Sequence, residues 1–168
     1  MDDLRIFALR AGPGRRVTAR PFQTEAELRR LVVRHAPTIL DVTILATEYP
    51  IASDGTGRID ALGIDADHRP VVLEFKRAAT GGAICQALYY LDWLLSHRDV
   101  FACLVLDRLG ARTARRIDWS VPRLLCIAEE VSEREEAVAR QIGRRVELLE
   151  VRRLPGGLLL LQRPRAVA

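Results

Sequence analysis

Residues 57–94 of the chain read GRIDALGIDADHRPVVLEFKRAATGGAICQALYYLDWL. Two apolar segments, Arg58–Asp65 and Pro70–Phe75, are separated by a short polar stretch, which predicts two strands joined by a turn. The break at Thr80-Gly81-Gly82 precedes apolar residues at helical spacing, which predicts a helix from Gly82 to His97. A pair of strands followed by a long helix indicates a sheet with a helix on its face.

Three charged side chains are expected to meet where the two strands lie side by side. Glu74 and Lys76 share one face of their strand because side chains alternate between faces. If the strands form a hairpin, positions whose numbers sum to 134 lie opposite each other, which puts Asp60 across from Glu74. Lys76 is the one lysine among 26 basic residues, which suggests that its position needs a compact ammonium group.

Two carboxylates this close repel each other unless a cation holds them, and a divalent ion that prefers oxygen ligands would do so. Such an ion would polarise a phosphodiester oxygen and acidify a bound water, with Lys76 beside it to position the water or to stabilise the developing charge. The alternative is a buried ion pair between Glu74 and Lys76, with Asp60 as an unrelated residue.

The predicted helix carries two stripes at helical spacing. The first is apolar and is expected to face the core, and the second, polar and aromatic, is expected to face away from it and meet a partner. The first consists of Ile84, Leu88, Leu91 and Leu95, and the second of Gln86, Tyr90, Trp93 and His97. The alternative places the helix beneath another layer, with Tyr90 and Trp93 in a secondary core.

The flanking sequence predicts alternating strands and helices. Before the central stretch we expect a hairpin of residues 4–9 and 16–22, a helix that starts with a capping box at Thr24 and Glu27, and a strand from Val42 to Glu48. After it we expect strands at 100–106, 123–128, 146–153 and 158–162, and helices near 111–117 and at 132–142. The prediction is an α/β fold with a hairpin appendage, 1–22, and one domain, 23–168.

Composition narrows the classes of protein. The 168 residues carry a net charge of +4 and are 49% hydrophobic, which fits one soluble, cytoplasmic domain with no membrane partner. Basic residues predominate before residue 41 and after residue 100, and acidic residues in between, as a cation site on a polyanion-binding surface requires. Cys85, Cys103 and Cys126 have no zinc-binding or nucleophile spacing and are expected to be buried thiols.

The segment of Asp60, Glu74-Phe75-Lys76 and Gln86-Ala87-Leu88-Tyr89-Tyr90 resembles the D…ExK…QxxxY signature of the PD-(D/E)XK nuclease superfamily. It is similar in particular to the RecB-like nuclease domain of NucS-type (EndoMS-type) endonucleases, where a GRID segment precedes the ExK strand. The resemblance covers about residues 22–108. It implies a restriction-endonuclease-like core, in which a central mixed sheet is flanked by helices.

The resemblance also implies roles for individual residues. Asp60 and Glu74 would be ligands of Mg²⁺ or Mn²⁺, Lys76 the catalytic lysine, and Gln86 and Tyr90 the helix residues that support the site and the DNA backbone. The family also uses a glutamate of the first helix. Glu25 and Glu27 compete for this role, and we choose Glu25 because the capping box already accounts for Glu27.

The implied partner is DNA, and RNA is not excluded. Candidate flat faces for bases are Tyr89 and Trp93, and candidate phosphate contacts are Arg58, Arg77, Arg15, Arg16, Arg29, Arg30 and Arg34. NucS-type enzymes carry a separate N-terminal DNA-binding and dimerisation domain that the hairpin cannot replace, so their mismatch specificity is not implied.

A homodimer through the edge strand at 158–161, or a larger repair or defence partner, is compatible with the sequence. The alternative function is a non-catalytic nucleic-acid-binding or partner-binding module that retains the nuclease fold.

Overall fold

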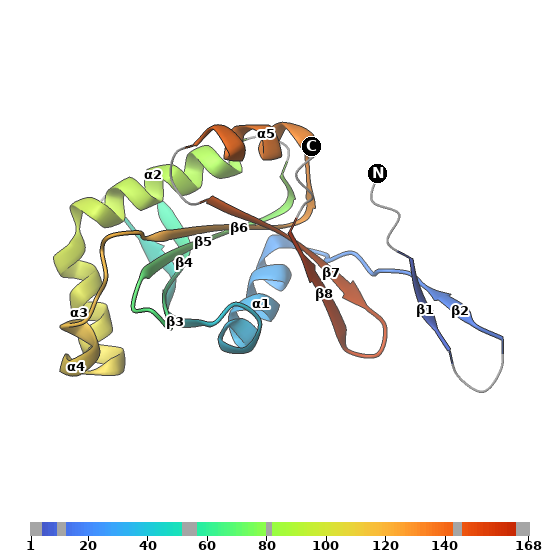
Figure 1. The fold of residues 1–168 in the computed structure, drawn as a ribbon, viewed down its shortest axis with the longest axis horizontal. Helices are drawn as coiled ribbons and strands as arrows, with labels where there is room; N and C mark the ends of the chain where they lie inside the picture. Colours follow the sequence, from blue (N-terminus) through green and yellow to red (C-terminus); the bar gives the residue numbers. More distant parts are fainter. Residues whose placement is uncertain (1–4, 10–12, 52–56, 80–81, 143–145, 164–168) are drawn as a thin grey trace.

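The computed structural model describes residues 5–9, 13–51, 57–79, 82–142 and 146–163. Its centre is a six-stranded sheet in the order β3-β4-β5-β6-β7-β8 (Figure 1). The β4–β5, β3–β4 and β7–β8 pairs are antiparallel, whereas β6 runs parallel to both β5 and β7. The strands are β3 Val42–Pro50, β4 Arg58–Asp65, β5 Pro70–Ala79, β6 Arg123–Val131, β7 Val146–Leu154 and β8 Leu158–Gln162.

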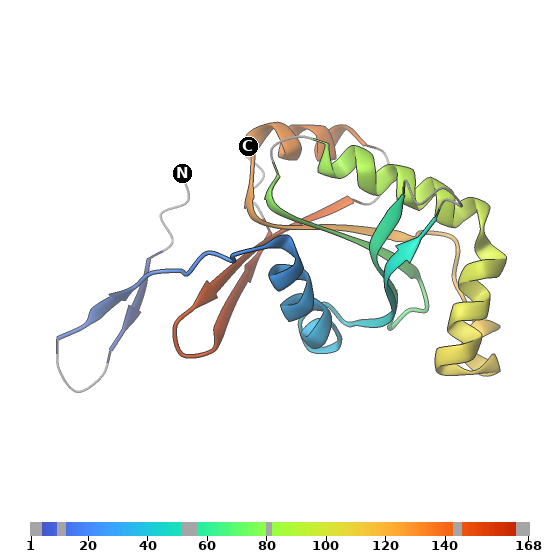
Figure 2. The ribbon, with the colours of Figure 1, turned by 180° about the vertical axis from the view of Figure 1, so that it is seen from behind.

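Helices cover both faces of this sheet, as Figures 1 and 2 show. One core lies between the sheet and α1, around Leu28, Val32 and Phe75, and the other lies beneath α2 and α3, around Val72, Leu91 and Leu124. The helices are α1 Glu25–Ile39, α2 Ala83–Ser96, α3 Arg98–Leu109, α4 Ala111–Ala114 and α5 Glu133–Gln141. The predicted α/β class, a mixed central sheet flanked by helices, is confirmed.

The hairpin of β4 and β5 has the predicted register. Ala61 pairs with Leu73 and Leu62 with Val72, so paired residues sum to 134. The turn is fixed by the side chain of Asp65, whose Oδ1 accepts the backbone N–H groups of Asp67 (3.0 Å) and Arg69 (2.8 Å). The described ladder ends at the Ala61–Leu73 pair, one position before Asp60 and Glu74.

One predicted strand is wrong: residues 100–106 belong to α3. The apolar run VFACLVL fits a buried strand, but a short apolar run does not distinguish a strand from a helix. In the structure Phe101 and Val105 are buried one helical turn apart, and the other residues of the run are more exposed. The helix forms because two inward-facing residues at this spacing are enough to attach it to the core beneath α2 and α3.

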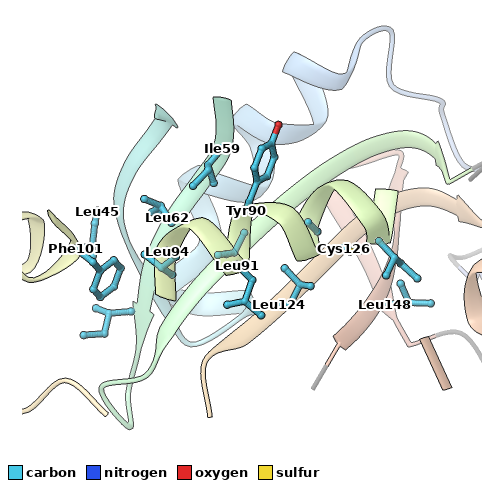
Figure 3. Close-up of a cluster of buried hydrophobic side chains, with 14 of the residues drawn as sticks. Leu45, Ile59, Leu62, Tyr90, Leu91, Leu94, Phe101, Leu124, Cys126 and Leu148 are labelled. Atoms are coloured by element: carbon cyan, nitrogen blue, oxygen red, sulfur yellow. The ribbon is translucent and has the colours of Figure 1, made fainter. Parts of the chain in front are cut away.

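The expected outward stripe of α2 is also wrong. Tyr90 is only 5% exposed and belongs to the core beneath α2 (Figure 3). The half-buried Trp93 packs against the same core. The helix turns Ala83, Ala87 and Leu94 toward the sheet, so the buried face is rotated from the predicted leucine stripe. The alternative reading, with Tyr90 and Trp93 in a core, describes this helix correctly.

The N-terminal hairpin stands apart from the main body, beside the β7–β8 hairpin, in both views (Figures 1 and 2). It consists of β1 Ile6–Ala8 and β2 Arg15–Val17, which are shorter than predicted. An isolated bridge between Arg20 and Arg153 links the following segment to β7. Among the described residues, no helix has the length and apolar character needed to cross a membrane.

Candidate functional site

The candidate site lies at the end of β5, where an apolar strand becomes charged. Val71, Val72 and Leu73 are fully buried between β4 and β6, and alternation then puts Glu74 and Lys76 on the α2 side of the sheet. There they line a small cavity together with Ala83 of α2 and Cys126 of β6. The central position of β5 in the sheet therefore forces two charged side chains into a mostly apolar environment.

Glu74 is 1% exposed, and its Oε1 lies 2.9 Å from Lys76 Nζ. The ammonium lies at ion-pair distance, but neither carboxylate oxygen of Glu74 has a donor in hydrogen-bonding geometry. Burial, followed by the charge of Asp60, raises the pKa of Glu74 to about 7. A buried carboxylate without donors is costly, so this position calls for a further cation or a proton.

Lys76 stays positively charged in this environment. Burial lowers the pKa of its ammonium group, but the contact with Glu74 and the charges of Glu25 and Asp60 outweigh burial and raise the pKa above its usual value. The four residues are thus close enough to influence one another electrostatically.

The side chain of Asp60 contacts β5 just beyond the last residue pair of the β4–β5 ladder. Its Oδ2 accepts the backbone N–H of Phe75 at 2.9 Å, and its Oδ1 accepts a hydrogen bond from Arg29 Nη1 at 3.0 Å. The carboxylate therefore replaces a strand carbonyl as the partner of β5 and is fixed next to Glu74. The structure thus brings Asp60, Glu74 and Lys76 together, as the sequence predicts.

The two first-turn glutamates of α1 have different surroundings. Glu27 accepts the backbone N–H of Gln23 at 2.7 Å, its own N–H is capped by Thr24 Oγ1 at 3.0 Å, and it pairs with Arg153. Glu25 is exposed and contributes to the pKa shifts of both Glu74 and Lys76. Glu25 is thus the first-helix glutamate whose charge acts on the site and whose carboxylate is not used in capping.

Gln86 and Tyr90 contact each other one turn apart on α2. Gln86 Nε2 donates to the hydroxyl of Tyr90 at 2.7 Å. Tyr90 stands beside Ile59, the neighbour of Asp60, with its hydroxyl directed away from the leucines of the core (Figure 3). This pair connects the helix to the part of β4 that carries Asp60.

Several of the candidate nucleic-acid contacts already have a partner within the protein. Arg58 pairs with Glu48 at 3.2 Å, Arg77 donates to the carbonyl of Gln23 at 3.1 Å, and Trp93 stacks on His97 with ring centroids 4.4 Å apart. The stacking on His97 and a tilted contact with the ring of Tyr49, with centroids 5.8 Å apart, cover part of the half-buried Trp93 ring. Arg58 and Arg77 are nevertheless exposed, as are the candidates Arg15, Arg16, Arg30 and Tyr89.

The cysteines do not match the expectation of three buried thiols. Cys85 and Cys103 are exposed, because both lie on the outer faces of their helices, and only Cys126 is buried. Burial, followed by the charges of Glu74 and Glu135, raises the pKa of the Cys126 thiol to about 12. The thiol beside the site is therefore protonated at neutral pH and a poor nucleophile.

Sequence reasoning missed Glu48 and the part played by Arg29, which it treated as a phosphate contact. Arg29 Nη2 lies 2.8 Å from Glu48 Oε1, while Nη1 contacts Asp60. No local pattern marks this contact, because it joins residues of α1, β3 and β4 and depends on how α1 packs on the sheet.

The donor set of Asp60 and Glu74 fits a hard divalent cation. Carboxylate oxygens are preferred ligands of Mg²⁺ and Mn²⁺, and the buried Glu74 oxygens have no hydrogen-bond donor to displace. Within the described ranges, no group of three or more His, Cys, Asp or Glu side chains is placed to hold one metal ion. An ion here would thus use two carboxylates and complete its coordination with water or substrate oxygens.

No protein-family model matches the chain. An uncharacterised protein of Haemophilus influenzae is 21% identical over 160 residues, which are 94% of this chain and 52% of that protein. The chain thus spans about half the length of this curated relative.

Two solved structures are similar to the chain. A repair endonuclease from Pyrococcus abyssi is 23% identical, with a TM-score of 0.49 over 79% of this chain and 50% of that chain. EndoMS in a complex with double-stranded DNA is 18% identical, with a TM-score of 0.47 over 88% of this chain and 64% of that chain. The chain is therefore similar, at low identity, to a repair endonuclease and to EndoMS.

Proposed function

We propose that the chain is a nuclease domain that hydrolyses phosphodiester bonds in DNA with Mg²⁺ or Mn²⁺. The observation that carries the proposal is the buried carboxylate of Glu74, which lies beside Asp60 and pairs with the single lysine of the chain, while its Oε2 has no hydrogen-bond donor. Buried charges in proteins are normally paired and hydrogen-bonded, and the exceptions concentrate at sites that bind a ligand.

In this proposal each residue has a limited role. Asp60 and Glu74 hold the divalent ion, which when bound supplies charge neutralisation at the phosphate and a more acidic water. Lys76 keeps its proton and places a positive charge beside the attacked phosphate. Glu25 orients the attacking water from α1, and the hydrogen bond from Gln86 fixes the hydroxyl of Tyr90 on α2.

The decisive experiment is cleavage of plasmid, linear duplex and single-stranded DNA with Mg²⁺ or Mn²⁺. We expect Glu74→Gln and Lys76→Met to reduce the rate by about 10³-fold or more, because the first removes a charged ligand of the divalent ion and the second removes the positive charge beside the phosphate. Arg112→Met, an exposed substitution on α4 outside the candidate phosphate contacts, is the control and should leave the rate unchanged. Cleavage that survives in both site variants would belong to a contaminant and refute these roles.

The rival function, a non-catalytic binding module, makes a different prediction for the same protein. It requires DNA binding that is insensitive to Mn²⁺, no heat on titration with Mn²⁺, and no cleavage. In favour of the nuclease, both carboxylates and the lysine are present and adjacent, and a module without catalysis has no need of a buried, donor-free Glu74. A calorimetric titration with Mn²⁺ separates the two functions.

The proposed DNA surface includes the N-terminal hairpin. Arg15 and Arg16 are exposed on β2, and the described residues 5–9 and 13–22 contain no acidic side chain. The double variant Arg15→Gln/Arg16→Gln should weaken binding equally for different DNA sequences and reduce the slope of log affinity against log salt by about 1 for each lost phosphate contact. An unchanged salt slope would remove the hairpin from the DNA surface.

A further inference from the structure

Three carboxylates form a row across three neighbouring strands. In the β3–β4 pair Thr47 lies opposite Ala61 and Tyr49 opposite Ile59, which puts Glu48 in line with Asp60. The β4–β5 register puts Glu74 in line with Asp60 on its other side. Adjacent strands are about 4.8 Å apart, so the row offers two positions for a cation, one on each side of Asp60.

The position between Glu48 and Asp60 is already filled by a cation. The guanidinium of Arg29 contacts Glu48 Oε1 at 2.8 Å with Nη2 and Asp60 Oδ1 at 3.0 Å with Nη1. The Arg29 and Asp60 side chains are 14% and 17% exposed and that of Glu48 is 45% exposed, so the Asp60 half of the bridge is the half shielded from water. A planar guanidinium with two nitrogens directed at two carboxylates is a geometry that lysine cannot reproduce.

The backbone conformation of Glu48 is a second observation in favour of a role for this bridge. Glu48 has a φ of 51°, in the left-handed region, as do Asp41 and His68. Asp and His adopt this conformation more readily than most residues, whereas a glutamate within a strand does so rarely and with steric strain. The protein keeps this strained conformation where the side chain holds Arg29.

We infer that Arg29 acts as a built-in second cation, which restricts the site to a single divalent ion bound by Asp60 and Glu74. Glu48 has the role of holding Arg29 beside Asp60. The inference rests on the proposed function for the first ion, but the effect of Arg29 on the number of ions can be measured without DNA. It also explains why, in the part of the chain described, Glu48, Asp60 and Glu74 do not form one three-carboxylate metal site.

The test is the stoichiometry of Mn²⁺ binding to the full chain, measured by calorimetry and by electron paramagnetic resonance. We expect the wild type to bind one ion and Arg29→Met to bind one more, because the second position then loses the cation that bridges its two carboxylates. Arg58 remains 3.2 Å from Glu48 Oε1, but its side chain is 58% exposed, so water screens its charge. The added ion should give the spectral signature of two coupled Mn²⁺ ions. Arg29→Met/Glu48→Gln should return to the wild-type number, because the second position then lacks one of its carboxylates.

Three further variants keep the test decisive. Arg34→Met, also on α1 but exposed, should bind the same number of ions as the wild type. Arg29→Lys keeps a positive charge and should also exclude the second ion. Arg29→Gln gives the same readout as Arg29→Met if the methionine variant does not fold, which circular dichroism would reveal.

The result that overturns the inference is the wild-type number of ions in both Arg29→Met and Arg29→Gln. This outcome is distinct from failure of the proposed function. A wild-type protein that binds one Mn²⁺ but cleaves no DNA would refute the nuclease, and the gain of an ion in Arg29→Met would still support the role of Arg29.

Discussion

Buried charges lie at both ends of the central strands, and the two ends treat them differently. At the end opposite the candidate site, Arg123 donates to Glu147 at 2.9 Å and to Asp65 at 3.3 Å. Glu147 also accepts from Arg163 at 2.8 Å, and Asp65 accepts two backbone N–H groups in its turn. Both carboxylates are 6–7% exposed, and each has donors for both of its oxygens.

The candidate site has a carboxylate that is buried more deeply and has no donors. Glu74 is 1% exposed, and only the ammonium of Lys76 lies beside it. A complete set of donors fixes a charge as part of the fold, whereas a missing donor leaves an oxygen available for a ligand. The comparison teaches that burial alone does not distinguish Glu74 from Asp65 and Glu147, and that its incomplete set of donors does.

The largest effect on stability is expected at Arg123. Arg123→Met leaves Asp65 and Glu147 buried without their shared cation, so we expect a loss of about 3–5 kcal/mol in the free energy of unfolding. Urea denaturation at pH 7 measures it, with Arg34→Met as the exposed control. A loss below about 1 kcal/mol in the free energy of unfolding would show that Arg123 does not stabilise the fold as the shared cation of two buried carboxylates.

At the candidate site, by contrast, we expect removal of the buried charge to raise the free energy of unfolding. The folded pKa of Glu74 is about 7 against an ordinary value of 4.5, so its contribution to stability is fully present below pH 4.5 and is lost as the pH rises through 7. Glu74→Gln removes the ionised form, and we expect the variant to be about 1–3 kcal/mol more stable than the wild type at pH 8.

This gain should shrink toward zero at pH 5, where the wild-type carboxyl is protonated. Urea denaturation at both pH values, in the presence of a chelator, checks the prediction. A variant that is less stable than the wild type at pH 8 would mean that Lys76 compensates the buried charge of Glu74 in full.

A smaller effect is expected from the neutral hydrogen bond on α2. Tyr90→Phe removes the hydroxyl that accepts from Gln86, and a net loss of about 0.5–1.5 kcal/mol follows from one hydrogen bond. Tyr89→Phe is the matched control, because Tyr89 is the adjacent tyrosine and is 59% exposed. Equal losses in the two variants in thermal unfolding would contradict a specific role for the pair.

The smallest effect is expected at the edge of the paired end. Arg163 contacts Glu147 like Arg123 does, but its side chain is 70% exposed. Arg163→Gln should change the free energy of unfolding by less than about 0.5 kcal/mol, because water replaces the lost contact. A loss as large as that of Arg123→Met would show that exposure does not separate the two arginines.

The sequence predicts the parts of the site that depend on local geometry. The turn after Asp65 sets the register of β4 and β5, and alternation along β5 sets the side of Glu74 and Lys76, so their meeting with Asp60 could be foreseen. The capping of α1 by Thr24 and Glu27 could be foreseen for the same reason.

Contacts that depend on tertiary packing could not be foreseen. The position of Glu48 follows from the irregular register of β3 between Ile44 and Ala46, and Arg29 reaches it only because α1 lies across the edge of the sheet. For α2, the leucine spacing indicates an amphipathic helix, but the buried face lies between the two expected stripes and includes Ile84 and Leu91 of the first and Tyr90 of the second. Tyr90 is inside because α2 turns its alanines toward the sheet.

The separation of the N-terminal hairpin from the main sheet has a consequence for local opening. β1 and β2 pair with each other over three residues each, and Arg20 joins the following segment to β7 by one bridge. Short peripheral ladders open with little loss of buried surface, whereas central strands open only with the whole fold. In deuterated water, the amide protons of Phe7 and Arg16 should therefore exchange long before those of Val72 and Leu125.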